Sequence, residues 1–264
     1  MSEATILTQI DDRGVATLTM NRPEVHNAFD DRFIANLTEK LVSLEQNPAV
    51  RLVILAASGS SFSAGADLDW MKRMAGYSRD ENLSDAMGLA GLMQQLNSLA
   101  KPTIALVQGA AYGGGVGLAA CCDIVLATRR ATFCLSEVKL GLIPAVISPY
   151  VLAAMGEKAC RRYFLTAEPF AAAEAQRLGL VHEVVEDEEA LLALAEKITV
   201  TLLRNSPQAL TAAKELIAAV AGQPLTSGLI ADTAGRIAEQ RSSKEGKEGL
   251  TAFLEKRKPD WIKE

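Results

Sequence analysis

A cluster of glycines between two apolar runs sets the strongest limit on this chain. Five of the nine residues of Gly109–Gly117 are glycine, and they follow the continuous apolar run Thr103–Val107. The next apolar run, Asp123–Ala127, leaves space for only about two turns of helix between the two predicted strands. The glycine-rich segment loosely fits a dinucleotide-binding fingerprint. That fingerprint belongs to a unit whose two parallel strands are joined by a dozen or more residues, and the connection here is too short. A nicotinamide site is therefore disfavoured. Two interpretations stay open, namely backbone N–H groups that face a ligand and simple close packing.

A second loop has a similar setting. Phe62–Leu68 follows the apolar run Leu52–Ala56 and precedes a helical pattern. Two loops of this kind, each leading from a strand into a helix, can direct two backbone N–H groups at one oxygen. Such a pair is an oxyanion hole, which stabilises a developing enolate or tetrahedral anion. Taken alone, the loop is better explained as a surface turn.

A carboxyl group stands in the mostly apolar stretch Phe133–Pro144. If Glu137 is buried there, desolvation raises the pKa of its carboxyl toward the range that suits a general acid–base group. The alternative is a solvated glutamate in a polar turn beside Lys139.

Strands and helices alternate in the first half of the chain, and helical patterns fill the second half. The sequence therefore predicts an α/β protein, with a catalytic core over residues 1–185 and a helical region over residues 186–264. Apolar residues at helical spacing behind Asp30 and Asp31 predict the first helix, with Phe33, Ile34, Leu37, Leu41 and Leu44 on its buried face. The other clear predictions are strands over 14–20, 52–56, 103–107 and 123–127, and a helix over 82–99.

Charge and composition exclude several classes of function. Twenty-seven basic and 32 acidic residues give a net charge of −5, which disfavours nucleic acid as a partner. No apolar run approaches a membrane span, and the first residues lack the pattern of a secretory signal. Only two histidines are present, so a zinc site or a Ser-His-Asp triad is poorly supplied. The four cysteines lie among apolar residues, and we expect reduced core thiols in a cytoplasmic protein.

Several motifs, taken together and in this order, resemble the crotonase (enoyl-CoA hydratase/isomerase) family. The resemblance covers nearly the whole chain and implies a spiral of ββα turns, chemistry on acyl-CoA thioesters, and trimers or dimers of trimers joined through the C-terminal helices. The motifs are Asn21-Arg-Pro23 with Asn27-Ala28, Phe62–Leu68, Gly109–Gly115, Glu137 with Gly141–Pro144, Ala171–Val181 and Glu248–Pro259.

The resemblance also implies roles for individual residues. The backbone N–H groups of Ala66 and Gly114 would form the oxyanion hole, and Glu137 would move the proton. Gly117 and Trp70 would line the substrate pocket. Neither a metal ion nor a cofactor is implied beyond the coenzyme A that the substrate carries. Contacts with coenzyme A, some of them across a subunit boundary, would come from Arg22, Ala64, Asp67, Leu68, Phe253 and Lys256.

One departure from the family pattern bears on the substrate. Typical hydratases of this family carry two glutamates, but Gly117 occupies the first of these positions, and Ala145–Pro149 replaces a glycine-rich stretch. In this respect the chain resembles bacterial 3-methylglutaconyl-CoA and isohexenylglutaconyl-CoA hydratases, which act in leucine and acyclic terpene degradation. We therefore expect hydration of a branched or carboxylated enoyl-CoA, with Gly117 making room for the branch. The alternative is a double-bond isomerase, since one carboxylate suffices for a 1,3-proton shift.

Overall fold

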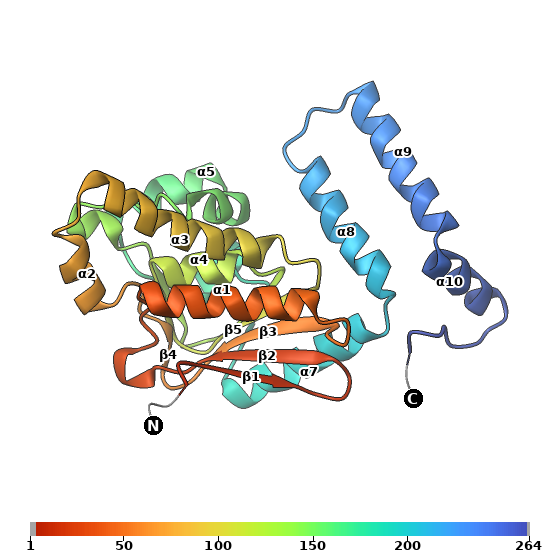
Figure 1. Ribbon diagram of the computed structural model, residues 1–264, viewed down its shortest axis with the longest axis horizontal. Helices are drawn as coiled ribbons and strands as arrows, with labels where there is room; N and C mark the ends of the chain where they lie inside the picture. The colour runs from red at the N-terminus through yellow and green to blue at the C-terminus, as the bar shows by residue number, and fades with distance from the viewer. Residues whose placement is uncertain (1–3, 263–264) are drawn as a thin grey trace.

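The computed structural model describes residues 4–262, and its core holds two β-sheets (Figure 1). One sheet has the strand order β1-β2-β3-β5-β7-β10, and the other has the order β4-β6-β8-β9. The strands are β1 (Ile6–Ile10), β2 (Val15–Met20), β3 (Leu52–Ala57), β4 (Ser61–Ser63), β5 (Thr103–Val107), β6 (Ala110–Tyr112), β7 (Ile124–Thr128), β8 (Thr132–Cys134), β9 (Phe170–Ala171) and β10 (Glu183–Val185).

The helices fall between successive pairs of strands and then continue alone to the end of the described chain. Within residues 4–262 no helix is both long and apolar enough to cross a membrane. The helices are α1 (Asp31–Gln46), α2 (Leu68–Met74), α3 (Arg79–Asn97), α4 (Gly114–Ala120), α5 (Ser148–Thr166), α6 (Ala172–Arg177), α7 (Glu188–Leu203), α8 (Pro207–Val220), α9 (Ser227–Ser242) and α10 (Lys244–Leu254), with the 3-10 helices η1 (Pro23–Val25) and η2 (Glu137–Leu140).

The connections form a spiral. Each of the pairs β3–β4, β5–β6 and β7–β8 contributes its first strand to the larger sheet and its second strand to the smaller one, and a helix follows. The spiral of ββα turns is thereby confirmed.

The smaller sheet determines where three loops meet. β4 pairs with β6 in parallel, and β6 pairs with β8 in parallel. Because parallel strands run in one direction, the chain leaves all three at the same edge of the sheet. The segments that emerge there are the one before α2, the start of α4 and the start of η2. They are the segments that carry Ala66, Gly114 and Glu137.

Alternating side chains of the larger sheet build two apolar layers. Val53 and Leu55 face the main core, whereas Leu52, on the opposite face, packs in a second cluster with Leu191 and Ala195 of α7. The helices that follow β10 start with α7, which packs on the larger sheet.

The last three helices extend away from this core. In Figure 1, α8, α9 and α10 stand at one end of the molecule, while α2 and the start of α3 lie at the other end. α8 is tied to the core by Lys214, whose Nζ lies 2.6 Å from a carboxylate oxygen of Asp123, and by the Thr211 hydroxyl, which donates to the carbonyl of Ala100.

Candidate active site

A cavity of about 350 Å³ opens at the edge where the three loops meet. Its lining comes from the loops after β4, β6 and β8, from α2 and α3, and from the segment that leads into α5. Ala66, Gly114 and Glu137 all line it, so the structure brings together the three residues that we expected to be catalytic.

Two backbone N–H groups are available at this cavity. Gly114 is the first residue of α4, and the first amides of a helix have no acceptor within it. Ala66 lies in the loop before α2, where the neighbouring residues Gly65 and Asp67 make the backbone hydrogen bonds to Phe29. Among residues 4–262, neither the Ala66 amide nor the Gly114 amide donates to a protein acceptor.

The ring of Phe29 packs against Gly114 and explains why a glycine stands there. A Cβ on Gly114 would lie 2.3 Å from Cζ of Phe29, which is far too close. The backbone of Phe29 in turn forms a parallel bridge with Ala66. One buried phenylalanine therefore holds both donor segments in register, and any larger residue at position 114 would force them apart.

Glu137 opens the 3-10 helix η2 and is half-buried. Burial raises the pKa of its carboxyl above the ordinary value, and a hydrogen bond from its own backbone N–H opposes this only in part. Its Oε2 is buried and has no hydrogen-bond partner among the described residues. Gly113, at φ +51°, approaches the other oxygen so closely that a Cβ there would lie 3.2 Å from Oε1. A carboxyl held in this way fits acid–base chemistry and not a solvated turn.

Asp67 and Arg22 support the loop that carries Ala66. The Asp67 carboxylate accepts hydrogen bonds from the Asp69 and Trp70 amides and so caps α2. Arg22 donates to the Asp67 carboxylate at 3.0 Å and to the carbonyl of Ala28 at 2.7 Å. Burial alone would raise the pKa of Asp67, but these hydrogen bonds and the Arg22 charge lower it. Both side chains thus hold the loop in place.

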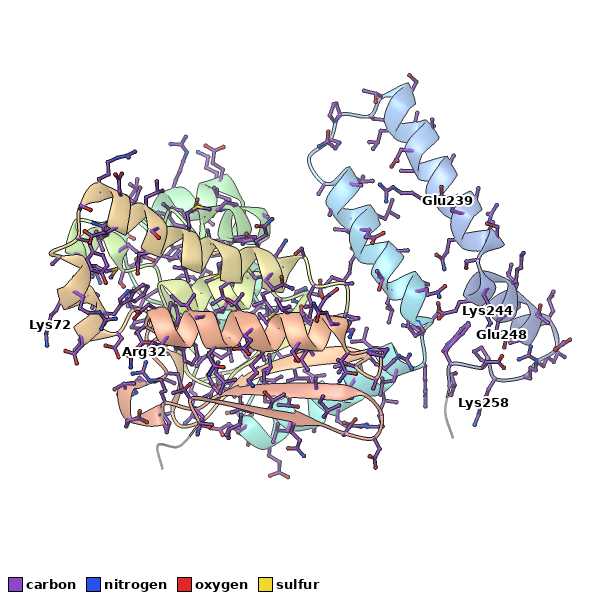
Figure 2. All side chains as sticks on the ribbon, in the orientation of Figure 1. Arg32, Lys72, Glu239, Lys244, Glu248 and Lys258 are labelled. Carbon is purple, nitrogen blue, oxygen red and sulfur yellow. The ribbon has the colours of Figure 1, made fainter. Side chains whose placement is uncertain are left out.

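The other expected binding residues are spread over the molecule. Ala64 and Trp70 line the cavity, whereas Leu68 is exposed outside the lining. Phe253 lies on α10 and Lys256 follows it, at the end of the molecule remote from α2. Figure 2 shows this separation through Lys72 on α2 and Lys244 and Glu248 on α10. Within one chain, therefore, the structure does not bring Phe253 and Lys256 to the cavity.

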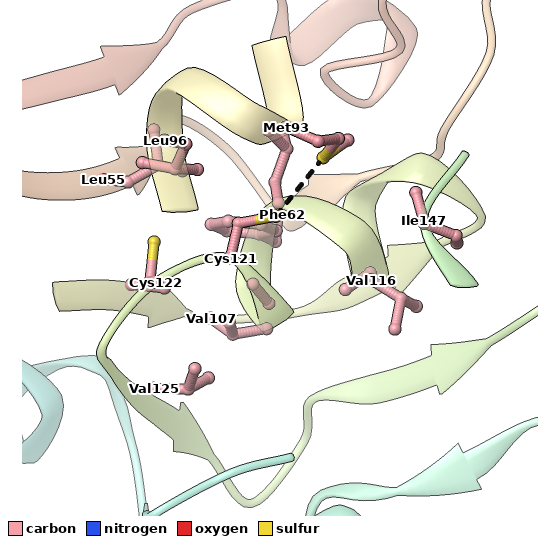
Figure 3. Close-up of a cluster of buried hydrophobic side chains, with 14 of the residues drawn as sticks. Leu55, Phe62, Met93, Leu96, Val107, Val116, Cys121, Cys122, Val125 and Ile147 are labelled. Carbon is pink, nitrogen blue, oxygen red and sulfur yellow. Dashed lines mark hydrogen bonds between the residues drawn. The ribbon is translucent and has the colours of Figure 1, made fainter. Parts of the chain in front are cut away.

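Our interpretation of Gly117 needs correction. Gly117 is buried in α4 and does not line the cavity. A Cβ there would lie 2.2 Å from Cγ2 of Ile147 and 3.1 Å from Cε of Met93. In Figure 3, Ile147 and Met93 both lie beside the helix that carries Val116, which is α4. The space that a glutamate side chain would need is thus filled by Ile147, and it is not open to a branch of the substrate.

This packing predicts that Gly117→Ala destabilises the fold by about 1–3 kcal/mol, the usual cost of overpacking a core. We expect the double variant Gly117→Ala, Ile147→Ala to lose less free energy of unfolding than the sum of the two single changes. The reason is that Ile147→Ala frees the space that the added methyl group at position 117 needs, and this methyl group partly fills the cavity left by Ile147→Ala. Urea unfolding of the four proteins measures this coupling. Strictly additive losses would show that the two positions do not compete for one space.

Sequence reasoning missed the contribution of α3. Asn82, Asp85, Ala86 and Leu89 line the cavity, and their spacing of three and four residues places them on one face of the helix. That spacing is visible in the sequence. Because polar and apolar residues share this face of the helix, however, the face does not show the continuous apolar pattern by which a buried helix face is recognised.

Neither thiols nor a metal cluster contributes to the cavity lining. All four cysteines are buried and unpaired, and burial raises the pKa of the Cys122 thiol to about 12. Within residues 4–262, no group of three His, Cys, Asp or Glu side chains is arranged to hold a metal ion.

Known proteins match this chain over nearly its whole length. A family described as enoyl-CoA hydratase/isomerase matches residues 11–264. An enoyl-CoA hydratase structure from Shewanella pealeana is 46% identical, with a TM-score of 0.95, and the match covers 98% of this chain and 96% of that one. AtuE of Pseudomonas aeruginosa is 34% identical, with a TM-score of 0.93 over 98% of this chain and 100% of its own.

A curated relative from Aspergillus fumigatus, named mevalonyl-coenzyme A hydratase sidH, is 35% identical over 94% of this chain and 91% of its own. The chain belongs to the enoyl-CoA hydratase/isomerase family.

Proposed function

We propose that this protein hydrates an α,β-unsaturated acyl-CoA through a thioester enolate. The observation that supports this most directly is the meeting of Ala66, Gly114 and Glu137 at one cavity. Two backbone donors and one carboxyl with a raised pKa are what such a reaction requires.

The steps follow from the roles of these groups. The thioester oxygen accepts hydrogen bonds from the Ala66 and Gly114 amides. Ionised Glu137 takes a proton from water as the hydroxyl adds to the β-carbon, and the electrons of the double bond move toward the thioester oxygen. Glu137 then delivers the proton to the α-carbon, and the thioester carbonyl re-forms. Atoms and charge balance, and the carboxyl returns to its starting state.

Coenzyme A would extend from the cavity past Ala64, Asp67 and Leu68, with Arg22 near its phosphates. Exposed apolar residues on the last helices favour a second role for that region. Leu225, between α8 and α9, and Phe253 and Leu254, at the end of α10, are 83%, 80% and 78% exposed, and large exposed apolar side chains mark an interaction surface. We propose that these helices join subunits into trimers or dimers of trimers in the cytoplasm, and that Phe253 and Lys256 reach coenzyme A on a neighbouring subunit.

For the acyl group we propose a branched substrate, with 3-methylglutaconyl-CoA as the first candidate. The motifs quoted above support it, and so does the relative named mevalonyl-coenzyme A hydratase, because a mevalonyl group is branched at its β-carbon. Since Ile147 occupies the space beside Gly117, the branch would be accommodated elsewhere in the cavity.

A panel of thioesters tests this proposal. Crotonyl-CoA is unbranched, 3-methylcrotonyl-CoA adds the branch, and 3-methylglutaconyl-CoA adds the branch and a carboxylate. We expect kcat/KM to rise along this series. A maximum at 3-methylcrotonyl-CoA would mean that the carboxylate is not recognised, and a maximum at crotonyl-CoA would contradict the branched substrate.

The filled space at Gly117 also favours the isomerase alternative, because one carboxylate can carry a proton from C2 to C4. The two reactions change the ultraviolet absorbance of the conjugated thioester in opposite directions. Hydration of a 2-enoyl-CoA removes this absorbance, whereas isomerisation of a 3-enoyl-CoA creates it. A protein that only raises the absorbance would be an isomerase.

The raised pKa of Glu137 has a consequence for the pH dependence of hydration. Because the ionised carboxyl accepts the proton of water, kcat/KM should fall as pH decreases through the pKa of Glu137 in the free enzyme. Burial places this acid limb at a higher pH than an ordinary glutamate would give. A rate profile from acidic to mildly alkaline pH measures it, and an acid limb in the ordinary glutamate range would contradict the assignment.

A further inference from the structure

The structure leaves one requirement of hydration without an obvious residue. The attacking water must be held with one O–H directed at Glu137 and its oxygen facing the β-carbon. Gly117 has no side chain, and Ile147 fills the space beside it with an apolar group. Glu137 can exchange protons, but a single carboxyl does not fix the orientation of a free water molecule.

A second carboxylate lines the same cavity. Asp85 is the seventh residue of α3, and it is half-buried. Its helix face carries Asn82, Ala86 and Leu89, which also line the cavity, so the side of α3 that bears Asp85 is turned toward the site.

Trp70 fixes the position of this carboxylate. The indole Nε1–H donates to Oδ1 of Asp85 at 3.0 Å, and Trp70 is only 4% exposed. Trp70 follows Ala66 by four residues, and its own amide donates to the Asp67 cap. Asp85 is thereby connected through one rigid turn to the loop that carries an oxyanion donor.

The hydrogen-bonding capacity of Asp85 is largely unused. Across residues 4–262, the indole N–H is its one hydrogen-bond donor, and no basic side chain forms an ion pair with it. The Oδ2 atom therefore keeps its lone pairs free of protein donors. A carboxylate needed only to anchor Trp70 would be as well served by a neutral amide, which accepts the same hydrogen bond without the cost of a half-buried charge.

Resting on the proposed hydration, we propose that Asp85 is a further catalytic residue that binds the attacking water. Its Oδ2 accepts a hydrogen bond from one O–H of this water, and the other O–H then points to Glu137. Asp85 takes no proton itself, so the balance of the reaction is unchanged. The site thus obtains its second carboxylate from α3, whereas the more usual family pattern takes it from α4.

Asp85→Asn tests this role because asparagine keeps the acceptor for Trp70 but turns an N–H₂ group toward the water. We expect kcat for hydration to fall by about 100-fold, as for a misplaced reactant, with little change in KM. The matched control is Asp80→Asn on the same helix, whose exposed carboxylate lies outside the cavity lining. This control should hydrate at the wild-type rate.

A second measurement distinguishes a role of Asp85 in binding the attacking water from a structural role in the cavity wall. Exchange of the α-protons of a saturated acyl-CoA in D₂O requires Glu137 and the oxyanion donors but no attacking water. We expect Asp85→Asn to keep this exchange within a few-fold of wild type while it loses hydration. Trp70→Phe, which removes the indole N–H donor to Asp85, is measured beside it. If both variants lose hydration and exchange in parallel, Asp85 only holds the cavity wall, and the proposal is overturned.

Two other outcomes are decisive. Unchanged hydration in Asp85→Asn would show that the water is held elsewhere. If the wild-type protein exchanges α-protons but hydrates none of the thioesters, the proposed function itself fails, and the role of Asp85 fails with it. Because the wild-type assay alone reveals that case, the two failures are distinguishable.

Discussion

Glu137→Gln is expected to lower kcat for hydration by about 10²–10⁴-fold, with little change in affinity for coenzyme A. Glutamine has the size of glutamate and fits beside Gly113, but it can neither take a proton from water nor deliver one to the α-carbon. Loss of the enoyl-thioester absorbance at saturating substrate measures the rate. A variant that keeps more than about a tenth of wild-type kcat would contradict the acid–base role.

The same variant provides its own control for folding. Burial raises the pKa of Glu137 in the folded state, so the folded chain holds this proton more tightly than the unfolded chain does. As pH rises from the ordinary glutamate pKa through the raised one, ionisation of the buried carboxyl lowers the free energy of unfolding. Glutamine avoids this loss. Urea unfolding should therefore show Glu137→Gln to be more stable than wild type above the raised pKa, with the difference vanishing at acidic pH.

Ala66→Pro is expected to lower kcat by about 10²–10³-fold, the usual cost of one oxyanion donor. Proline removes the N–H, and no protein hydrogen bond is lost with it, because among residues 4–262 the Ala66 amide has no protein acceptor. Gly114 is the poorer target, since any Cβ there meets the ring of Phe29 at 2.3 Å.

Two comparisons separate the loss of the Ala66 N–H from the other effects of the proline. Proline also restricts the backbone of the residue before it, and Gly65 has a φ of +86°. Because this restriction can destabilise the fold, the thermal midpoint of the variant must be measured. Ala66→Gly keeps the N–H and reports the cost of a looser loop alone. Binding provides the second comparison: Ala66→Pro should weaken the binding of acetoacetyl-CoA, which can bind as an enolate, more than that of a saturated acyl-CoA. Equal weakening of both ligands would argue against an oxyanion hole at Ala66.

Long periodic elements could be predicted from the sequence. The buried face expected for the first helix, from Phe33 to Leu44, is the face that α1 buries, and Asp30 caps it by accepting from the Phe33 amide. Thr103–Val107 is β5 without a change of bounds. These segments have enough residues for an amphipathic or apolar pattern to stand out from its flanks.

The strands that place the catalytic groups could not be predicted in this way. β4, β6 and β8 have three residues each and consist largely of small or polar residues such as Ser61, Ala110 and Thr132. Three residues are too few to show a period of two. The sequence pattern therefore indicates that two loops can direct N–H groups at one oxygen, but only the family resemblance assigns these groups to Ala66 and Gly114.

The interpretation of Gly117 failed for a different reason. A glycine shows that a side chain is absent, but the sequence does not show what occupies its place. Here the neighbour is Ile147, 30 positions further along the chain, and only the packing of α4 against the segment before α5 reveals it. Asp85 was missed in the same way, since its hydrogen bond to Trp70 spans 15 positions.

The parallel pairing of β4 and β6 gives the oxyanion hole a built-in length scale. Neighbouring strands of any sheet lie about 4.8 Å apart, and two donors that each lie about 3 Å from a shared oxygen can be at most about 6 Å apart. Chain segments that leave adjacent parallel strands at one edge start within that limit before any side chain is chosen. Substitutions in α3 or in the segment before α5 can therefore change which acyl group fits while the spacing of the reactive donors stays constant.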